Sequence, residues 1–581
     1  MLDLLLTGGL LVDGTGAPSV LADIGVRDGR IAVIAAPGSI TETATETLDV
    51  TGLVVGPGFI DVHTHLDAQL LWDSTGSPSL QHGCTTVVCG NCGFSLAPSG
   101  PEQADYLTLM LSRVESMPLA ALRAAIDWTW TSFDEWLAQF DGNLSVNAGF
   151  LVGHSALRRA VLGDDFARTD LTEAERDAIL TLVRESLDAG ALGFSTSLST
   201  SHLDGQSNPV PSRYAGADEM LAIADVVRNH EAPVMQITVA GTSSGFQQDE
   251  VELLTDISLR SDRPINWNVL MVRADDRAYL DRQLAASDYA SERGAMVLAL
   301  SPPNSNAMRM SFETGAFLYA IPGWGELFRY GPSERIDALR GTEWRDRLQA
   351  LAQAPEAGVI RGRTQWQLLT LRETWSARNK EWEGHTFGEI AAARKTTPFD
   401  AMIDIVVDDE LRTGIEGPPM HVTDADWALR ADVLCDPRVI VGGSDAGAHV
   451  DMFVGATYTT SFLSEVVRER ALVALEEAVR LITDRPARLY GLRDRGRVAE
   501  GWIADLTIFD PETVANLPAV TVADLPAGSS RLIAEAIGIP HVIVNGVFAL
   551  RDGQVTDARP GTTLRTGRDT DRVSLASARS E

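Results

Sequence analysis

The chain has little of the basic charge that binds nucleic acid or membranes, and little cysteine. Its 581 residues include 48 basic and 80 acidic side chains, for a formal net charge of −32. Such a surface repels phosphate backbones and anionic lipid, which argues against nucleic acid or a membrane as partner. Four cysteines are too few for a disulfide scaffold in so long a chain. No apolar run approaches the ~18 residues that a membrane span needs.

Lysine is almost absent, since Lys380 and Lys395 are the only two. A carboxylated lysine that bridges two metals has to lie at a strand end, and neither lysine is predicted there, so this kind of two-metal site is not expected. The first residues are apolar but include Asp3 and no basic residue, and they lead into a Gly-Gly turn. That pattern predicts strand and turn, not a signal peptide. We therefore expect a cytoplasmic protein.

The composition, 45% hydrophobic and 22% charged, is that of an ordinary globular protein. Both ends read as short strands separated by Gly-containing turns. We predict that residues 1–55 and 490–560 form one small β-sandwich domain. The polar tail, residues 561–581, is either disordered or folds back as a cover.

Between these ends, residues 56–489 alternate apolar, β-branched runs with helical stretches. Eight strands alternating with helices predict an α/β fold, a TIM-like (β/α)8 barrel, with its chemistry at the carboxyl ends of the strands. The predicted strands cover residues 54–62, 85–89, 146–152, 191–195, 233–239, 264–270, 295–300 and 439–443.

Two connections are too long for simple loops. Residues 98–145 and an insertion at 301–437 together contain most of the tryptophans. Insertions at strand ends often build pockets and lids, but these tryptophans could equally fill the cores of the insertions.

The first strand ends in Gly58-Phe-Ile-Asp-Val-His63-Thr-His65. Alternate side chains of a strand point the same way, so His63 and His65, about 7 Å apart, both face the barrel axis and can converge on one metal. The alternative is a pair of buried, hydrogen-bonded histidines.

Two further strand ends offer suitable ligands. The second strand ends Cys89-Gly-Asn-Cys92, and the Cys92 thiolate is a good zinc ligand, although a packed core thiol is the alternative. The eighth ends Gly442-Gly-Ser-Asp445, where a carboxylate can bind the metal and accept the proton of an attacking water. A turn or helix cap is the alternative for Asp445.

These motifs, with Pro57-Gly-Phe-Ile-Asp before His63 and the late Gly501-Trp-Ile-Ala-Asp-Leu, resemble the D-aminoacylase (N-acyl-D-amino-acid deacylase) branch of the amidohydrolase superfamily. The resemblance covers roughly residues 1–240 and 435–555. It implies a barrel with a terminal β-sandwich, with His63, His65, Cys92 and Asp445 as metal ligands. It also implies Asp445 as the general base.

The chain departs from that family at strands five and six, where D-aminoacylases have metal-binding histidines. Here Gln236 and Asn268 occupy the strand ends. Amide side chains are poor zinc ligands beside imidazole. We therefore predict one zinc per chain, with Gln236 and Asn268 holding substrate or water.

Other polar residues follow the strands. His154 comes after strand three and is predicted either to act in catalysis or to make a structural hydrogen bond. Ser197 and His449 are expected to contact substrate. An acyl-amino-acid carboxylate needs a cationic partner, for which Arg158, with Arg213 and Arg273, are candidates.

Together these features predict a zinc-dependent hydrolase of an amide bond in a small molecule. Two alternatives share the barrel and its metal, namely a cyclic-amide hydrolase or deaminase, and a hydrolase of another amide or ester. A third is a metal-free, non-catalytic homologue, against which the intact His63, His65 and Asp445 argue. The sequence does not indicate the oligomeric state.

Overall fold

A parallel eight-stranded sheet forms the centre of the computed structural model, which describes residues 1–242, 244–305, 307–315 and 317–579, without the side chains of 358–360 and 579. Its strands follow one another in chain order from first to last, and each lies on one predicted strand. They are β6 (Phe59–Asp61), β7 (Cys84–Cys89), β8 (Asn147–Gly153), β9 (Gly193–Ser197), β10 (Val234–Thr238), β11 (Ile265–Asn268), β12 (Val297–Ser301) and β16 (Val439–Val441).

The first and last of these strands meet just beyond their carboxyl ends. Thr64 and Ala446 form a parallel bridge, in which the His65 amide donates to the Ala446 carbonyl at 2.7 Å. The Asp445 amide donates to the His63 carbonyl at 3.2 Å. The residues after β6 and after β16 therefore lie side by side, as closure of a barrel requires.

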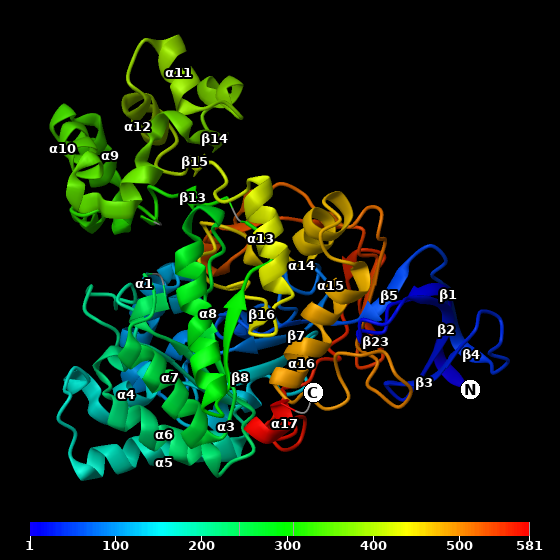
Figure 1. Cartoon of the computed structure of the whole chain (residues 1–581). Helices are drawn as coiled ribbons and strands as arrows, with labels where there is room; N and C mark the ends of the chain where they lie inside the picture. The colour runs from blue at the N-terminus through cyan, green and yellow to red at the C-terminus, as the bar shows by residue number, and fades with distance from the viewer. Residues whose placement is uncertain (243, 306, 316, 580–581) are drawn as a thin grey trace.

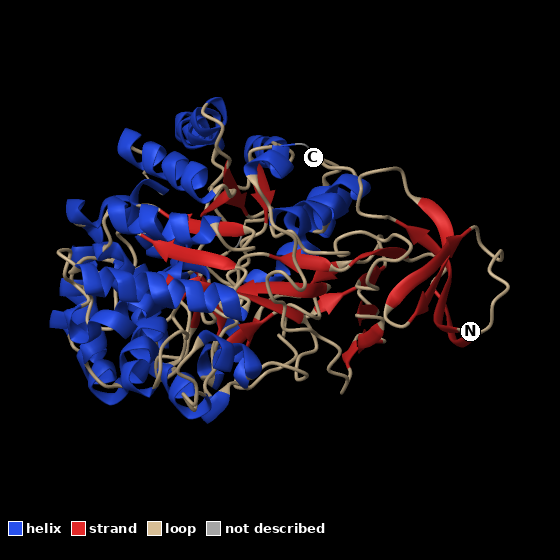
Figure 2. Cartoon of the chain, turned by 90° about the horizontal axis from the view of Figure 1, so that it is seen from below, coloured by secondary structure: helices blue, strands red, loops and turns tan. Residues whose placement is uncertain are grey.

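Helices cover the outside of this sheet (Figure 2). α5 shows why they form: Thr172 and Glu175 make a capping box at its start, Gly190 ends it, and Ile179, Val183 and Leu187 bury one face. The helices between the strands are α4 (His154–Leu162), α5 (Glu173–Ala189), α6 (Ala217–Arg228), α7 (Gln248–Ser261), α8 (Arg277–Glu292) and α13 (Asp424–Leu434). Among the described residues, none of the helices is both long and apolar enough to span a bilayer.

The connection after β7 contains three short helices, and further helices follow β16. The former are α1 (Ala104–Val114), α2 (Leu119–Ala125) and α3 (Phe133–Ala138), and the latter are α14 (Tyr458–Ser461), α15 (Leu475–Ile482) and α16 (Asp484–Leu489). Trp130 and Trp136 of the first connection are buried against each other, with ring centroids 4.6 Å apart. These tryptophans therefore fill a core.

The two chain ends share a nine-stranded sheet at the side of the molecule away from the barrel helices (Figure 1). β5 of the N-terminal part pairs antiparallel with β17 of the C-terminal part. The strands are β1 (Leu2–Leu11), β2 (Val20–Arg27), β3 (Arg30–Ala35), β4 (Ala44–Asp49), β5 (Val54–Pro57), β17 (Leu506–Phe509), β22 (His541–Val544), β23 (Val547–Arg551) and β24 (Gln554–Val555). The sandwich arrangement itself stays a prediction.

The insertion between β12 and β16 has its own core, which includes Trp324, Trp366, Phe399 and Ile403. Its helices gather at one corner of the molecule (Figure 1). They are α9 (Pro332–Arg340), α10 (Thr342–Gln353), α11 (Phe387–Arg394) and α12 (Pro398–Asp408), with a small sheet of β13 (Arg309–Met310), β14 (Thr370–Glu373) and β15 (Gly414–Glu416). Trp375 is largely exposed.

The last segment folds back on the barrel. The Gly561 amide donates to the Leu144 carbonyl at 2.7 Å, and the Leu564 amide donates to Ala148 of β8 at 2.8 Å. The polar tail is expected either to be disordered or to fold back as a cover, and residues 561–564 fold back. The remaining elements are two strand pairs, β18 (Ala515–Asn516) with β21 (Ala536–Ile537) and β19 (Val520–Val522) with β20 (Arg531–Ile533), and α17 (Leu575–Arg579).

Candidate active site

Two buried histidines follow the first strand of the barrel sheet. β6 ends at Asp61, and the rings of His63 and His65 lie with their centroids 5.4 Å apart. Residues two apart in an extended segment point the same way, so both rings face the same space at the carboxyl edge of the sheet.

Cys92 joins them from the turn after β7. Its Sγ lies 3.6 Å from His63 Nε2. His63, His65 and Cys92 each offer one possible metal-ligand atom, and these three atoms lie within 4.8 Å of one another. Gly90 makes this turn feasible, because its φ of +76° is disfavoured for other residues and a Cβ there would lie 2.3 Å from the Leu151 carbonyl oxygen. The backbone of Cys92 itself has a φ of +56°.

Asp445 reaches the same cluster from the eighth strand. Its Oδ1 lies 3.1 Å from His63 Nε2 and 3.9 Å from His65 Nε2. Its side chain is 36% exposed, whereas those of the two histidines are at most 2% exposed. Asp445 is therefore the carboxylate through which this buried group meets open space.

The charges of the cluster act on one another. Burial opposes ionisation of Asp445, but the hydrogen bond and the charge of His63 hold the pKa of Asp445 below its usual range. Burial would lower the pKa of His63, but the charges of Cys92 and Asp445 raise it well above its usual value. Burial, with the charge of His63, lowers the pKa of His65 to about 3. Asp445 is thus ionised at neutral pH.

The amides at strands five and six hold Cys92. Gln236 Oε1 accepts from the Cys92 amide at 2.7 Å, and Asn268 Nδ2 donates to the Cys92 thiol at 3.4 Å. Asn268 Oδ1 accepts from Gln236 Nε2 and from Thr238 Oγ1. Gln236 is fully buried and both ends of its amide are hydrogen-bonded, so its contacts position the thiol, and substrate binding by Gln236 stays a prediction.

Glu115, which the sequence did not single out, lies between two histidines. Its Oε1 is 3.6 Å from His65 Nδ1 and its Oε2 is 3.8 Å from His449 Nε2. Its backbone carbonyl accepts from the His449 amide at 2.6 Å. Burial and the charge of Asp445 raise the pKa of Glu115 well above its usual value. Glu115 caps α1 inside an irregular connection, so no strand-end pattern could have indicated it.

His154 and Arg158 do not join the cluster. His154 is fully buried at the start of α4, where Nδ1 lies 2.9 Å from Thr196 Oγ1 and Nε2 lies 2.8 Å from Glu219 Oε1. Arg158, also fully buried, pairs with the other oxygen of Glu219 and donates to the Phe166 carbonyl. Both side chains are hydrogen-bonded within this network, which is the structural alternative stated for His154. Catalysis by His154 and carboxylate binding by Arg158 stay predictions.

The remaining predicted residues lie around the cluster. Ser197 is buried, and its Oγ is 2.7 Å from His202 Nδ1. Burial lowers the pKa of His202 to about 4. Its ring lies 5.2 Å from the ring of Phe94, which follows Cys92 by two residues. Arg213 donates to the Thr200 and His202 carbonyls, so its guanidinium stabilises the loop after β9 and is not free to bind a substrate.

A cavity of about 410 Å³ opens at Asp445. Its walls come from the segments after β11 and β12 and from the insertion. Of the predicted site residues, Asp445 alone lines it within the described part of the chain. The volume is in the range of small-molecule sites.

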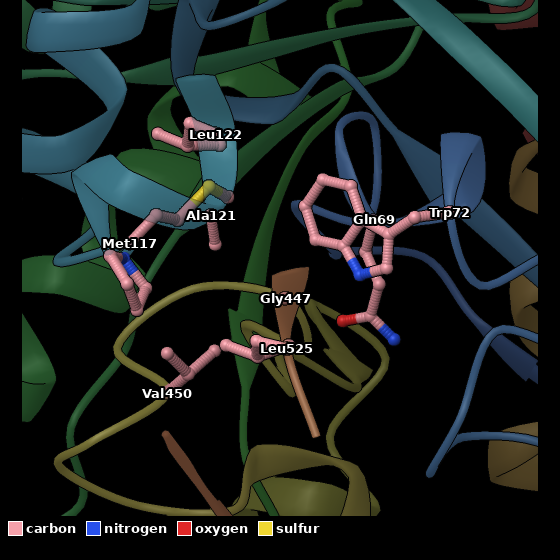
Figure 3. Close-up of a pocket in the computed structure, with 9 residues that line it drawn as sticks. Gln69, Trp72, Met117, Ala121, Leu122, Gly447, Val450 and Leu525 are labelled. Atoms are coloured by element: carbon pink, nitrogen blue, oxygen red, sulfur yellow. The ribbon is translucent and has the colours of Figure 1, made fainter. Parts of the chain in front are cut away.

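A second hollow, of about 10 Å³, lies beside the loop that contains Gly447 (Figure 3). Its walls include Trp72, Met117, Leu122 and Leu525. That volume holds at most about one water molecule, so the hollow is not a substrate site.

Comparison with known proteins agrees with this geometry. The model of the Amidohydrolase family matches residues 46–549. The chain is 29% identical over 574 residues to the N-acyl-D-aspartate deacylase of Alcaligenes xylosoxydans xylosoxydans, covering 97% of this chain and 95% of the relative.

Two solved structures are similar over nearly the whole chain. One is the N-acyl-D-glutamate deacylase of Bordetella bronchiseptica complexed with zinc and a phosphonate mimic of the tetrahedral intermediate, at 27% identity and a TM-score of 0.63, covering 97% of this chain and 99% of that one. The other is a D-aminoacylase described by its binuclear metal centre, with one-metal activation and second-metal attenuation, at 26% identity and a TM-score of 0.63, covering 97% and 100%. The resemblance seen in the sequence is confirmed. The protein belongs to the amidohydrolase family and is a metal-dependent hydrolase of carbon–nitrogen bonds other than peptide bonds.

Proposed function

We propose that the protein deacylates a small N-acyl-amino-acid-like substrate, of the N-acyl-D-amino-acid type, with one zinc ion per chain. The observation that supports this most directly is the gathering of His63, His65 and Cys92, with Asp445 beside them at the cavity. The named relatives act on N-acyl-D-aspartate and N-acyl-D-glutamate, which suggests the substrate class.

The donor set fits zinc. Imidazole nitrogen, thiolate sulfur and carboxylate oxygen are the ligands that zinc takes in proteins, and four of them suffice for its tetrahedral preference. His63, His65 and Cys92 are buried, and a buried cluster of such groups is costly unless its charges are paired or bind a metal. Asp445 completes the set from the open side.

A second zinc would lack imidazole ligands from strands five and six. The positions that could supply imidazoles at strands five and six are Gln236 and Asn268, whose amides hydrogen-bond to each other and to Cys92. Amide oxygens are weak zinc ligands beside imidazole, so we propose that one zinc is held tightly.

The residues of the cluster have distinct roles in the proposed reaction. When bound, zinc supplies a Lewis acid that polarises an amide carbonyl and lowers the pKa of a water toward ~7. Asp445, ionised and open to the cavity, accepts the proton of the attacking water at its carboxylate and returns it to the leaving nitrogen. Gln236 and Asn268 keep the Cys92 thiol in place.

An assay on paired substrates tests the substrate class. Zinc-loaded protein should hydrolyse N-acetyl-D-amino acids faster than the matching N-acetyl-L-amino acids, measured as release of free amine. Equal or absent hydrolysis of both sets would contradict the proposed substrate, and hydrolysis of cyclic amides alone would favour the cyclic-amide alternative.

The variant Asp445→Asn tests the proposed base. It keeps the shape and one ligand oxygen but removes the basic carboxylate, and a positioned base typically contributes ~100- to 10,000-fold. We expect turnover to fall by at least about 100-fold while much of the zinc stays bound. Near-normal turnover with zinc bound would show that another group takes the proton.

A further inference from the structure

The cavity at Asp445 is mostly apolar. Met271 follows β11, Met308 and Met310 follow β12, and Phe453 follows Asp445 itself, and all four line it. Methionine side chains are flexible and adapt to apolar shapes. A substrate with an apolar body therefore fits between the barrel and the insertion.

Positively charged side chains outnumber negatively charged ones in the wall of the cavity. Asp445 is the single acidic residue in its wall, counted over the described residues, and the other charged or titratable wall residues are Arg363, Arg430 and His421. Arg363, His421 and Arg430 all belong to the insertion, and Arg430 lies on its helix α13. In a chain with a net charge of −32, two arginines in one apolar cavity are a local exception.

Arg363 has no acidic partner. Its Nη1 lies 3.3 Å from the Met308 thioether, its guanidinium lies 5.5 Å from the centre of the Phe317 ring, and no described carboxylate forms an ion pair with it. Burial lowers the pKa of Arg363, and the nearby charge of Arg273 lowers it further. A guanidinium that is half-buried beside a thioether and a ring gains from an anion brought by a ligand.

Arg430 has unused hydrogen-bonding capacity in the same wall. Its side chain is 4% exposed, Nη2 donates to the His421 carbonyl at 3.1 Å, and Nη1 is buried with no hydrogen-bond partner among the described residues. The guanidinium stacks on Trp427 at 4.4 Å, which fixes its plane. The charges of Asp426 and Glu465 act on Arg430, but neither is hydrogen-bonded to it.

We propose that Arg363 and Arg430 form an anion subsite in this cavity. It binds a carboxylate of a substrate whose apolar body lies against Met271, Met308 and Met310 and whose scissile amide lies at Asp445. The proposal rests on the proposed function for the position of the amide. Arg158 pairs with Glu219 and Arg213 donates to the Thr200 carbonyl, so the guanidinium groups available in the cavity are those of Arg363 and Arg430.

Binding of a matched pair of probes tests the subsite without relying on turnover. The probes are 1-octanesulfonate and uncharged 1-octanol, titrated calorimetrically into the zinc-loaded protein. A sulfonate is used because a carboxylate would also bind zinc directly. Charge-assisted hydrogen bonds are the strong ones, so we expect the sulfonate to bind at least about tenfold more tightly than the alcohol.

Three variants locate the preference. Arg363→Met and Arg430→Met should each remove most of the tenfold difference and leave octanol binding within about twofold. Arg228→Met removes the same charge from the outer surface, where Arg228 donates to the Leu259 and Arg260 carbonyls, and should change neither probe. Because Arg363 is half-buried and unpaired, its variant is expected to fold even if Arg430→Met does not.

The outcomes separate this proposal from the proposed function. Equal binding of the two probes, or an equal loss in Arg228→Met, overturns the subsite whatever the enzyme hydrolyses. Loss of sulfonate preference in Arg363→Met supports the subsite even if N-acyl-amino acids prove not to be substrates. If they are substrates, Arg363→Met should raise KM at least about fivefold for the free acid but not for its primary amide.

Discussion

At the residue scale, the site consists of four ligand candidates and a few residues that orient them. Cys92 is held through its amide by Gln236 and through its sulfur by Asn268. Glu115 faces the ring nitrogen of His65 that points away from Asp445. Carboxylates in this position fix the ring orientation of metal-binding histidines and raise their basicity. Glu115, which was not among the predicted site residues, is thus in a position to orient the His65 ring.

The variant Glu115→Gln tests this role. It keeps the size of the side chain but replaces the carboxyl group that faces His65 and His449 with an amide. We expect zinc affinity or turnover to fall by about 10- to 100-fold, as loss of such partners does elsewhere, with an unchanged thermal midpoint within a few degrees. Zinc titration and initial rates measure the effect, and Glu102→Gln, an exposed position, is the control. Unchanged zinc affinity and unchanged rates together would remove Glu115 from the site.

At the element scale, the strands, their ends and the place of the insertion were predictable, and the helices and strands inside the insertion were not. Parallel strands are buried on both faces, so β7, Cys-Thr-Thr-Val-Val-Cys, reads as one buried run. Their carboxyl ends meet at one edge, which is why His63 and Asp445 could be assigned together although 382 residues separate them.

The predicted site residues that lie outside the cluster do so for a common physical reason. His154 follows a strand end too, but it is the first residue of α4, where its ring turns toward Glu219 of α6. Spacing along the chain does not indicate whether a residue just past a strand turns inward or outward. Arg363 and Arg430 come from the insertion, where no strand periodicity indicated a site.

The turn after β7 can be tested with a pair of glycine variants. Gly90→Ala adds a Cβ at a φ of +76°, 2.3 Å from the Leu151 carbonyl oxygen, so the turn that contains Cys92 must shift. Gly52→Ala has a φ of +85° with nothing within 4 Å, so it has only the backbone strain, about 1–2 kcal/mol. We expect Gly90→Ala to lose zinc as well as stability, and Gly52→Ala to lose stability alone. Equal zinc content in the two variants would contradict the role of this turn.

The contact of α4 with α6 predicts a pH-dependent contribution to stability. Burial raises the pKa of Glu219, but His154 and Arg158 together lower it to about 2, against an ordinary value of 4.5. The unfolded chain therefore binds a proton more readily than the folded one, so this contribution is full above about pH 4.5 and is lost as the pH falls toward 2. Glu219→Gln should cost about 3 kcal/mol at pH 7, because it leaves Arg158 buried without its partner.

Chemical denaturation of Glu219→Gln at pH 7 and pH 3 measures this contribution to the free energy of unfolding. The loss relative to wild type should shrink at the lower pH. Glu175→Gln, in the exposed capping box of α5, is the matched control and should show a much smaller loss. A Glu219→Gln protein as stable as wild type at pH 7 would mean that the buried pairs contribute nothing net.

At the scale of the whole molecule, a sheet built from both chain ends lies at one side and the insertion at another corner (Figure 1). The barrel sheet between them presents its carboxyl edge to the cavity, whose remaining wall the insertion supplies. The barrel thus fixes the reacting groups, and the insertion determines what reaches them. Fold and metal site recur across many chemistries, so substrate choice depends on the residues of this wall.

The central claim is that one zinc is held by the cluster at the first, second and eighth strands. Its most direct test is elemental analysis after dialysis against a chelator, on wild type, His63→Ala and His385→Ala, whose histidine is exposed in the insertion. We predict about one zinc per chain in wild type and in His385→Ala, and little in His63→Ala despite an unchanged circular dichroism spectrum. Two zincs that survive dialysis, or a full zinc complement in His63→Ala, would contradict the claim.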